Sequence, residues 1–148
     1  MQGDEPEIQP EHIDLAISTL KSNVTSVMAT IASPFADDED PADPNIVKVV
    51  VGNDGSALYF SRSLIPYDLD GEYNVKPLKH IGLYVYRKEF LPKYVALPMT
   101  DLEQTEKLEQ LRVLEHGYKI AVAIANVKYH GIDTLQHYQA FVERYLES

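Results

Sequence analysis

Two acidic residues lie where they could bind a hard cation. Asp4 belongs to "QGDEP", a glycine- and proline-bounded turn that would direct carboxylate oxygens outward, and Asp133 follows the apolar segment "KIAVAIA". Two carboxylates at neighbouring strand ends could share Mg²⁺, which prefers a few oxygen ligands completed by water and phosphate. Two other interpretations stay open: Asp4 as part of a solvated lead-in to a helix, and Asp133 as the N-cap of the last helix, with Gln136 three residues on.

Polar side chains in the middle of the chain could line a pocket. His80 and Tyr84 are four residues apart in a predicted strand, so they should face the same side. Arg62 follows the buried-looking "ALYFS", where its guanidinium fork could bind a carboxylate or phosphate in bidentate fashion. A hydrogen-bonded core histidine, a packed tyrosine and a surface arginine would give the same pattern.

A further polar stripe lies in the C-terminal half. Glu106, Glu109 and Gln110 are spaced i, i+3 and i+4 on a predicted helix and therefore share one face. Such a face most often contacts only solvent, although it could also contribute to a polar pocket.

The composition limits the possible functions. A chain of 148 residues, with 45% hydrophobic residues, suits one globular domain over 1–148. The net charge of −10 argues against nucleic acid or an anionic membrane as a partner, because both require clustered cations. With no cysteine, thiol nucleophiles and zinc thiolates are excluded. No apolar run suits a membrane span or signal peptide, so we expect a cytoplasmic protein.

These residues require regular elements to position them. The hydrophobic pattern predicts an α/β layered sheet flanked by helices, with an antiparallel β-hairpin excursion over 45–62 around Asn53, Asp54 and Gly55. The predicted helices cover about 10–21, a short stretch within 87–97 if Pro92 falls in its first turn, 100–117 and 133–148. The other predicted strands are 24–32, 79–86 and 119–125, and loops cover 33–45 and 63–78.

Two details refine these elements. Thr100 and Glu103 are spaced as a capping box at the start of the 100–117 helix, and Gly117 suits its C-terminal cap. "QGDEP" has the character of a loop that follows a strand, and only Met1 and Gln2 precede it, so we expect an N-terminally incomplete domain.

Six segments, in order, resemble one enzyme family. They are "QGDEP", "DPNIVKVVV", "DGSALYFSRSLIPYD", "KHIGLYVYRKEFL", "LEQTEKLEQLRVLEHGYKIAV" and "GIDT". Together they are similar to 3-deoxy-D-manno-octulosonate (Kdo) cytidylyltransferase, also called CMP-Kdo synthetase, over its C-terminal portion. The resemblance implies a nucleotidyltransferase-like fold, usually a homodimer, that joins CTP and Kdo to give CMP-Kdo and pyrophosphate for lipopolysaccharide biosynthesis.

The resemblance also implies roles for individual residues. Asp4 and Asp133 would hold Mg²⁺. The residues that would surround the sugar acid are Gln2, Arg62, His80, Tyr84, Glu109 and Gln110. We further expect the hairpin 45–62 to form the dimer contact, because its strands carry more apolar surface than one face of a thin sheet can bury.

The sequence departs from this family in one important respect. The family's glycine-rich, Arg/Lys-bearing loop, which would cradle the triphosphate, is not among these 148 residues. We therefore expect the isolated chain to be inactive and to supply mainly the Kdo-binding and dimerisation part. The alternative is a truncated, non-catalytic remnant that binds a sugar acid or a partner chain without turnover.

Overall fold

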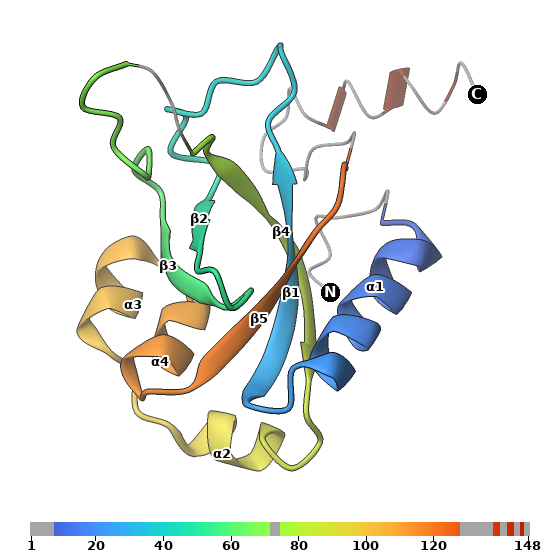
Figure 1. The fold of residues 1–148 in the computed structure, drawn as a ribbon, viewed down its shortest axis with the longest axis vertical. Coiled ribbons are helices and arrows are strands. Elements are labelled where there is room, and N and C mark those ends of the chain that lie inside the picture. Colours follow the sequence, from blue (N-terminus) through green and yellow to red (C-terminus); the bar gives the residue numbers. More distant parts are fainter. Residues whose placement is uncertain (1–7, 72–74, 128–137, 140–141, 144–145, 147–148) are drawn as a thin grey trace.

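The computed structural model describes residues 8–71, 75–127, 138–139, 142–143 and 146. Its elements run α1 (Pro10–Ser22), β1 (Ser26–Pro34), β2 (Lys48–Val51), β3 (Ala57–Ser61), β4 (Leu78–Tyr86), α2 (Leu91–Ala96), α3 (Asp101–Glu106), α4 (Gln110–Glu115) and β5 (Lys119–Ile124). The five strands form one sheet in the order β3-β2-β4-β1-β5 (Figure 1). The predicted α/β class is therefore confirmed.

Strand directions in the sheet are mixed. β1 pairs in parallel with β5 and antiparallel with β4, and β2 pairs antiparallel with both β3 and β4. β3 and β4 consequently run in the same direction on either side of β2. β4 also carries an irregularity, because its register against β1 shifts between Thr30 and Ile31, whose partners are Tyr84 and Ile81.

Helices cover the two faces of the sheet. Helix α1 packs on one face, which is the side opposite α3 and α4 in Figure 1. Under α1 the buried apolar residues are Ala16, Ile31, Ile81, Leu83, Ala123 and Val127. On the other face they are Met28, Ala32, Val49, Ala57, Phe60, Phe90, Leu108, Leu111, Val113, Ile120 and Val122. Burial of both sets supplies the hydrophobic free energy that holds the three layers together.

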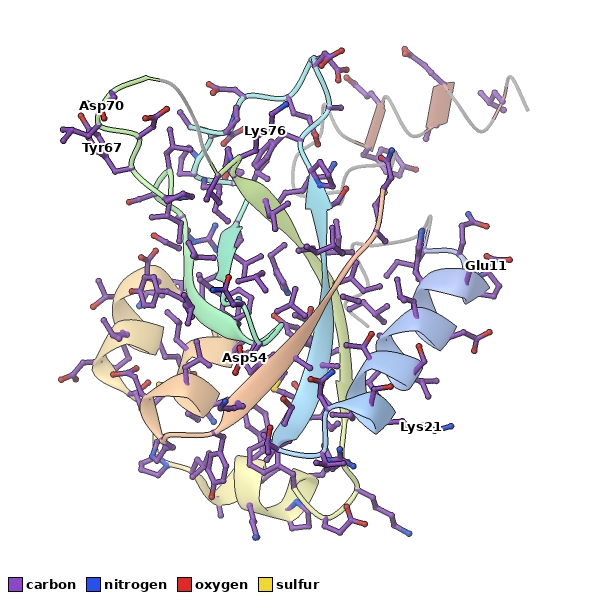
Figure 2. The ribbon with its side chains drawn as sticks, in the orientation of Figure 1. Glu11, Lys21, Asp54, Tyr67, Asp70 and Lys76 are labelled. Atoms are coloured by element: carbon purple, nitrogen blue, oxygen red, sulfur yellow. The ribbon has the colours of Figure 1, made fainter. Side chains whose placement is uncertain are left out.

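The predicted hairpin is confirmed, and its turn reaches across the sheet to β5. Gly55 adopts φ 75° in this turn, a conformation that glycine accepts without a Cβ clash. Its carbonyl oxygen accepts a hydrogen bond of 2.9 Å from the backbone N–H of Val122. Asp54, labelled in Figure 2, forms an ion pair of 2.8 Å with Lys119. The hairpin is therefore fastened at its turn to the edge strand β5.

The hairpin buries part of its apolar surface within its own chain. Val49 and Phe60 are at most 1% exposed and Ala57 is 8% exposed, whereas Leu58 is 63% exposed. The apolar surface that motivated the predicted dimer contact is thus covered only in part, because its other apolar residues are half-buried or, at Leu58, exposed. The dimer contact itself stays a prediction.

The predicted helix over 100–117 is wrong in one respect, because the chain forms two short helices there. Lys107 ends α3 in the left-handed conformation, with φ 56°. Both predicted ends are confirmed: Glu103 accepts a hydrogen bond from the Thr100 backbone N–H, and Gly117 caps α4 with φ 77°. Pro92 lies in the first turn of α2, where its missing N–H costs nothing.

The remaining loops agree with their predictions. The segment between β3 and β4 forms no regular element among its described residues, and Tyr67 and Asp70 project from it at one end of the molecule (Figure 2). The predicted last helix, 133–148, lies mostly outside the described residues, although 138–139, 142–143 and 146 are helical. None of the helices in the described ranges is long and apolar enough to cross a membrane.

Candidate functional site

Strand β4 brings His80 and Tyr84 together on the sheet face opposite α1, beside Phe60 of β3. Their ring centroids are 5.3 Å apart, which confirms the prediction that the two side chains share a side. Tyr86 continues the row, with its ring 6.3 Å from that of Tyr84. Three polar aromatic side chains thus line one face of this strand.

His80 is held from two directions. Its Nε2 atom lies 2.8 Å from Thr30 Oγ1 on β1, and its ring meets Phe60 of β3 edge-on at 5.1 Å. Burial lowers the pKa of the His80 imidazole to about 3, since little solvent is available to stabilise a charged ring. His80 is therefore neutral at physiological pH and available for hydrogen bonding rather than for charge pairing.

The tyrosine row continues onto α2. The Tyr94 ring is 5.6 Å from the Tyr86 ring, and the guanidinium of Arg112 lies 5.4 Å above Tyr94. Burial raises the pKa of Tyr84, Tyr86 and Tyr94, and the negative charge of nearby Glu109 adds to each increase. These hydroxyls therefore stay protonated at neutral pH. Tyr86 donates its hydrogen bond to Tyr94, whereas the hydroxyls of Tyr84 and Tyr94 can donate to a ligand.

The break between α3 and α4 gives the predicted polar stripe three different environments. Glu109 is exposed at the N-cap of α4, whereas Gln110, the first residue of α4, is only 5% exposed. Glu106 Oε1 accepts a hydrogen bond of 2.6 Å from Ser61 Oγ, and Glu106 Oε2 accepts one of 2.9 Å from the Arg62 backbone. The interpretation of this stripe as a solvated helix face is therefore wrong for Glu106 and Gln110.

Arg62 lies at the end of β3, held by backbone oxygens. Its Nε donates to the Glu106 carbonyl at 2.8 Å and its Nη1 donates to the Pro44 carbonyl at 3.0 Å. These bonds orient the guanidinium. The Nη2 group has no hydrogen bond to any residue in the described ranges and can donate to an anion.

The strand register relates Arg62 to His80. Ser61 and Lys79 both pair with Lys48, from opposite sides of β2. Because strands are spaced about 4.8 Å apart, the backbones of Arg62 and His80, one residue further along β3 and β4, are about 10 Å apart. The backbone of Arg62 thus lies two strand spacings from that of His80, while the rings of His80 and Tyr84 are in contact and the Glu109 charge lies near Tyr84. The predicted binding roles of these residues stay predictions.

Lys48 is a buried cation that the sequence reasoning missed. Its side chain is fully buried, and Nζ donates to the carbonyl oxygens of Asp43 at 2.8 Å, Ile46 at 2.6 Å and Arg62 at 2.5 Å. Burial lowers the pKa of this ammonium group, and the nearby Asp43 carboxylate opposes that effect. A single charge within the apolar run "IVKVVV" was the signal that could have identified it.

Thr30 and Tyr86 were also missed. Thr30 is one of three hydroxyl residues in the segment "VTSVMATIA", and Tyr86 follows Tyr84 at the strand's two-residue period. The period could have placed Tyr86 beside Tyr84, whereas the contact of Thr30 with β4 depends on a register shift that a single sequence does not reveal.

A separate cavity of about 420 Å³ lies beyond the carboxyl ends of β1 and β5. Its lining residues are Pro34, Phe35, Ala36, Asp37, Asp38, Lys79, Asn126 and Val127. On its wall, Lys79 pairs with Glu39 at 2.5 Å, and both side chains are at most 5% exposed. The Lys79 charge is therefore already balanced by a carboxylate of the protein.

Three predicted site residues, Gln2, Asp4 and Asp133, lie outside the described residues. The described ranges contain no group of three or more His, Asp or Glu side chains that could hold a metal ion. The predicted Mg²⁺ site therefore stays a prediction.

Known proteins resemble this chain over most of its length. A 3-deoxy-manno-octulosonate cytidylyltransferase of Solibacter usitatus is 45% identical over 134 residues, which are 90% of this chain and 53% of that protein. One from Rhodopirellula baltica is 44% identical over 151 residues, covering 97% of this chain and 60% of that protein. The chain thus spans about half to three-fifths of the curated relatives that it matches.

A solved structure has the same fold. It is that of CMP:2-keto-3-deoxy-manno-octonic acid synthetase complexed with CTP, which matches with a TM-score of 0.85 and 36% identity over 98% of this chain and 61% of that one. Residues 1–120 match a family model described as cytidylyltransferase. The chain, with its sheet, its hairpin and the polar face over β4, therefore belongs to the cytidylyltransferase family.

Proposed function

We propose that this chain forms the sugar-acid-binding part of an enzyme that transfers CMP from CTP to Kdo, giving CMP-Kdo and pyrophosphate for lipopolysaccharide biosynthesis. The observation that carries the proposal is the contact of His80 with Tyr84 beside the charge of Glu109, with the Arg62 backbone two strands away, in a chain similar to Kdo cytidylyltransferases. These residues combine a cation for a carboxylate with aromatic and polar groups for a sugar ring.

The reaction requires positioning more than covalent machinery. The anomeric oxygen of Kdo attacks the α-phosphorus of CTP, the bond to the β-phosphate oxygen breaks, and the anomeric proton leaves to solvent or base. Arg62 would bind the Kdo carboxylate, while His80, Tyr84, Glu109 and Gln110 would form hydrogen bonds with its hydroxyls. Holding the two reactants in line can contribute on the order of 7 to 11 kcal/mol to catalysis.

Mg²⁺ would be held by Asp4 and Asp133, with Gln2 beside the sugar acid. The support for this part is the resemblance of "QGDEP" and "GIDT" to the family's segments and the preference of Mg²⁺ for carboxylate oxygens. When bound, the metal would neutralise part of the charge of the triphosphate, which would favour its binding to a chain of net charge −10.

A homodimer through the hairpin forms part of the same proposal. Leu58, at 63% exposure, is the hairpin side chain that would contact the partner. Sedimentation of the wild type and of Leu58→Asp tests this contact, and we expect a dimer for the first and a monomer for the second. A monodisperse wild-type monomer at high concentration would contradict it.

Two assays separate the enzyme from its alternative, a non-catalytic binding protein. Calorimetry would measure Kdo binding to the purified chain, with Arg62→Gln as the test variant and the exposed Lys88→Gln as the control. Pyrophosphate release would be measured with CTP, Kdo and Mg²⁺, with and without a separately expressed N-terminal segment from a full-length relative.

We expect Kdo binding that Arg62→Gln weakens at least tenfold and Lys88→Gln leaves unchanged. We expect pyrophosphate release only on mixing with the N-terminal segment. If the chain binds Kdo but releases no pyrophosphate when mixed with the N-terminal segment, the non-catalytic alternative is favoured. If the wild-type chain does not bind Kdo, the proposal is refuted.

A further inference from the structure

The hydroxyl group of Thr30 lies among three polar atoms of β4. Thr30 Oγ1 is 2.8 Å from the Leu83 carbonyl oxygen, 3.3 Å from the Ile81 carbonyl oxygen and 2.8 Å from His80 Nε2. Thr30 is fully buried, so no bulk water replaces these contacts. The arrangement exists because the β1–β4 register shifts next to Thr30, which turns two carbonyls of β4 toward the same hydroxyl.

The number of hydrogens determines the direction of each bond. A threonine hydroxyl carries one hydrogen, and a carbonyl oxygen can only accept. At 2.8 Å, Thr30 Oγ1 and the Leu83 oxygen would bring two lone pairs together unless the hydroxyl hydrogen lies between them. Since that hydrogen is directed at a carbonyl, the contact with His80 requires the hydrogen on Nε2.

Protonation at Nε2 leaves Nδ1 with a lone pair. Neutral imidazole carries one N–H, and His80 is neutral at physiological pH because burial lowers its pKa to about 3. No residue in the described ranges donates a hydrogen bond to Nδ1, and the residue as a whole is only half-buried. The ring therefore offers a ligand one hydrogen-bond acceptor.

We propose that Thr30 is a positioning residue that holds His80 protonated at Nε2, so that His80 Nδ1 accepts a hydrogen bond from a hydroxyl group of the sugar acid. This inference rests on the proposed function and adds a rule of specificity to it. A ligand hydroxyl at this position can donate to Nδ1, whereas a methoxy or carboxylate oxygen would meet its lone pair and be rejected.

Nitrogen NMR of the ¹⁵N-histidine-labelled chain at pH 8 tests the tautomer without any ligand. His116 is an internal reference, because its Nδ1 lies 2.8 Å from the Arg112 carbonyl and must donate, which gives the opposite tautomer. Comparison with His80→Gln assigns the His80 signals. We expect His80 to be protonated at Nε2 in the wild type and in Thr30→Ser, which keeps the hydroxyl, and to show both tautomers in Thr30→Val.

Wild-type His80 protonated at Nδ1 would overturn the inference without any variant. An unchanged tautomer in folded Thr30→Val would overturn the role of Thr30. Since these readouts involve no sugar, they are independent of the proposed function.

Binding measurements test the ligand side. Thr30→Val should weaken Kdo binding about tenfold, the effect of one hydrogen bond, and Thr30→Ser should restore it. Among Kdo derivatives with one hydroxyl methylated, one should bind to the wild type and to Thr30→Val with the same affinity. The hydroxyl methylated in that derivative is the one that donates to Nδ1. If every derivative stays as sensitive to Thr30→Val as Kdo, the proposed acceptor role is refuted. Absence of Kdo binding to the wild type would refute the proposed function, while the tautomer spectrum would still decide the role of Thr30.

Discussion

Arg62 and Glu106 are joined by two separate hydrogen bonds that connect β3 to α3. The Arg62 backbone N–H donates to Glu106 Oε2 at 2.9 Å, and Arg62 Nε donates to the Glu106 carbonyl oxygen at 2.8 Å. The first bond fixes the end of the strand and the second fixes the plane of the guanidinium. The orientation of Arg62 therefore depends on a helix that ends one residue later, at the left-handed Lys107.

Replacing Glu106 by alanine should loosen this connection. The carboxylate also accepts a hydrogen bond from Ser61, so Glu106→Ala leaves two buried or half-buried donors without a partner. We expect a loss of about 2 kcal/mol in the free energy of unfolding, measured by urea denaturation. Glu115→Ala, an exposed acidic residue of α4, is the matched control and should change stability by less than about 0.5 kcal/mol. Equal stability of the two variants would contradict the structural role of Glu106.

Replacing Lys107 by glycine should stabilise the fold. At φ 56° a residue with a Cβ is strained by roughly 1 to 2 kcal/mol, whereas glycine adopts this conformation freely at a smaller entropic cost. We expect Lys107→Gly to raise the free energy of unfolding by up to about 1 kcal/mol. Lys93→Gly, in the exposed interior of helix α2, should lower it by a similar amount. Destabilisation by both variants would be the contrary result.

The unexpected helix break shows the limit of local patterns. The segment 100–117 has helical periodicity and correct caps, and no glycine or proline separates α3 from α4. The break instead accompanies tertiary contacts, because Glu106 binds the end of β3 while Leu108 is 6% exposed in the core. By contrast, α1, the hairpin and β5 are set by periodicity and turn residues within their own segments, and these were predicted to within about three residues at each end.

The ion pair between Glu103 and Arg112 should make stability depend on pH. Arg112 Nε and Nη2 donate to the two oxygens of Glu103 at 2.7 and 2.5 Å. This pairing lowers the pKa of Glu103 below its ordinary value of 4.5. The native state therefore binds fewer protons than the unfolded state, so the stabilisation is complete above that value and is lost as the pH falls below it.

Glu103→Gln measures this contribution. We expect it to cost about 2 kcal/mol at pH 7, and the difference from wild type to shrink as the pH falls from about 5 to 3. Thermal unfolding at several pH values provides the data, with the exposed Glu89→Gln as the control. A difference that stays constant over that range would show that the charge of Glu103 does not stabilise the fold.

Lys48 should be essential for the order of the acidic loop before β2. Lys48→Met keeps the length of the side chain but removes donors to three carbonyl oxygens, those of Asp43, Ile46 and Arg62. We expect a loss of roughly 3 kcal/mol and faster cleavage of the 35–47 segment by an Asp- or Glu-specific protease. Lys21→Met, at the exposed end of α1 (Figure 2), should behave as wild type. Wild-type cleavage rates in folded Lys48→Met would contradict this role.

The site was less predictable than the fold. His80 and Tyr84 could be paired because a strand has a fixed period of two. The partners of His80 and Arg62 lie on other strands and loops, namely Thr30, Glu106 and Pro44, and sequence spacing carries no information about contacts of that kind.

Asp133 provides the last prediction, which concerns the proposed Mg²⁺ site. Asp133→Asn should reduce pyrophosphate release by the chain mixed with an N-terminal segment at least a hundredfold. The reason is that a neutral amide replaces one of two carboxylates proposed to hold the metal that offsets the triphosphate charge.

Kdo binding to the same variant should stay at the wild-type value, since Arg62, His80, Tyr84 and Glu109 are unchanged. Asp14→Asn, an exposed aspartate of α1, is the control for both assays. If Asp133→Asn loses both Kdo binding and pyrophosphate release, Asp133 is needed for the fold. If pyrophosphate release is unchanged, Asp133 is not a ligand of the metal. Only loss of release with retained Kdo binding agrees with a metal ligand.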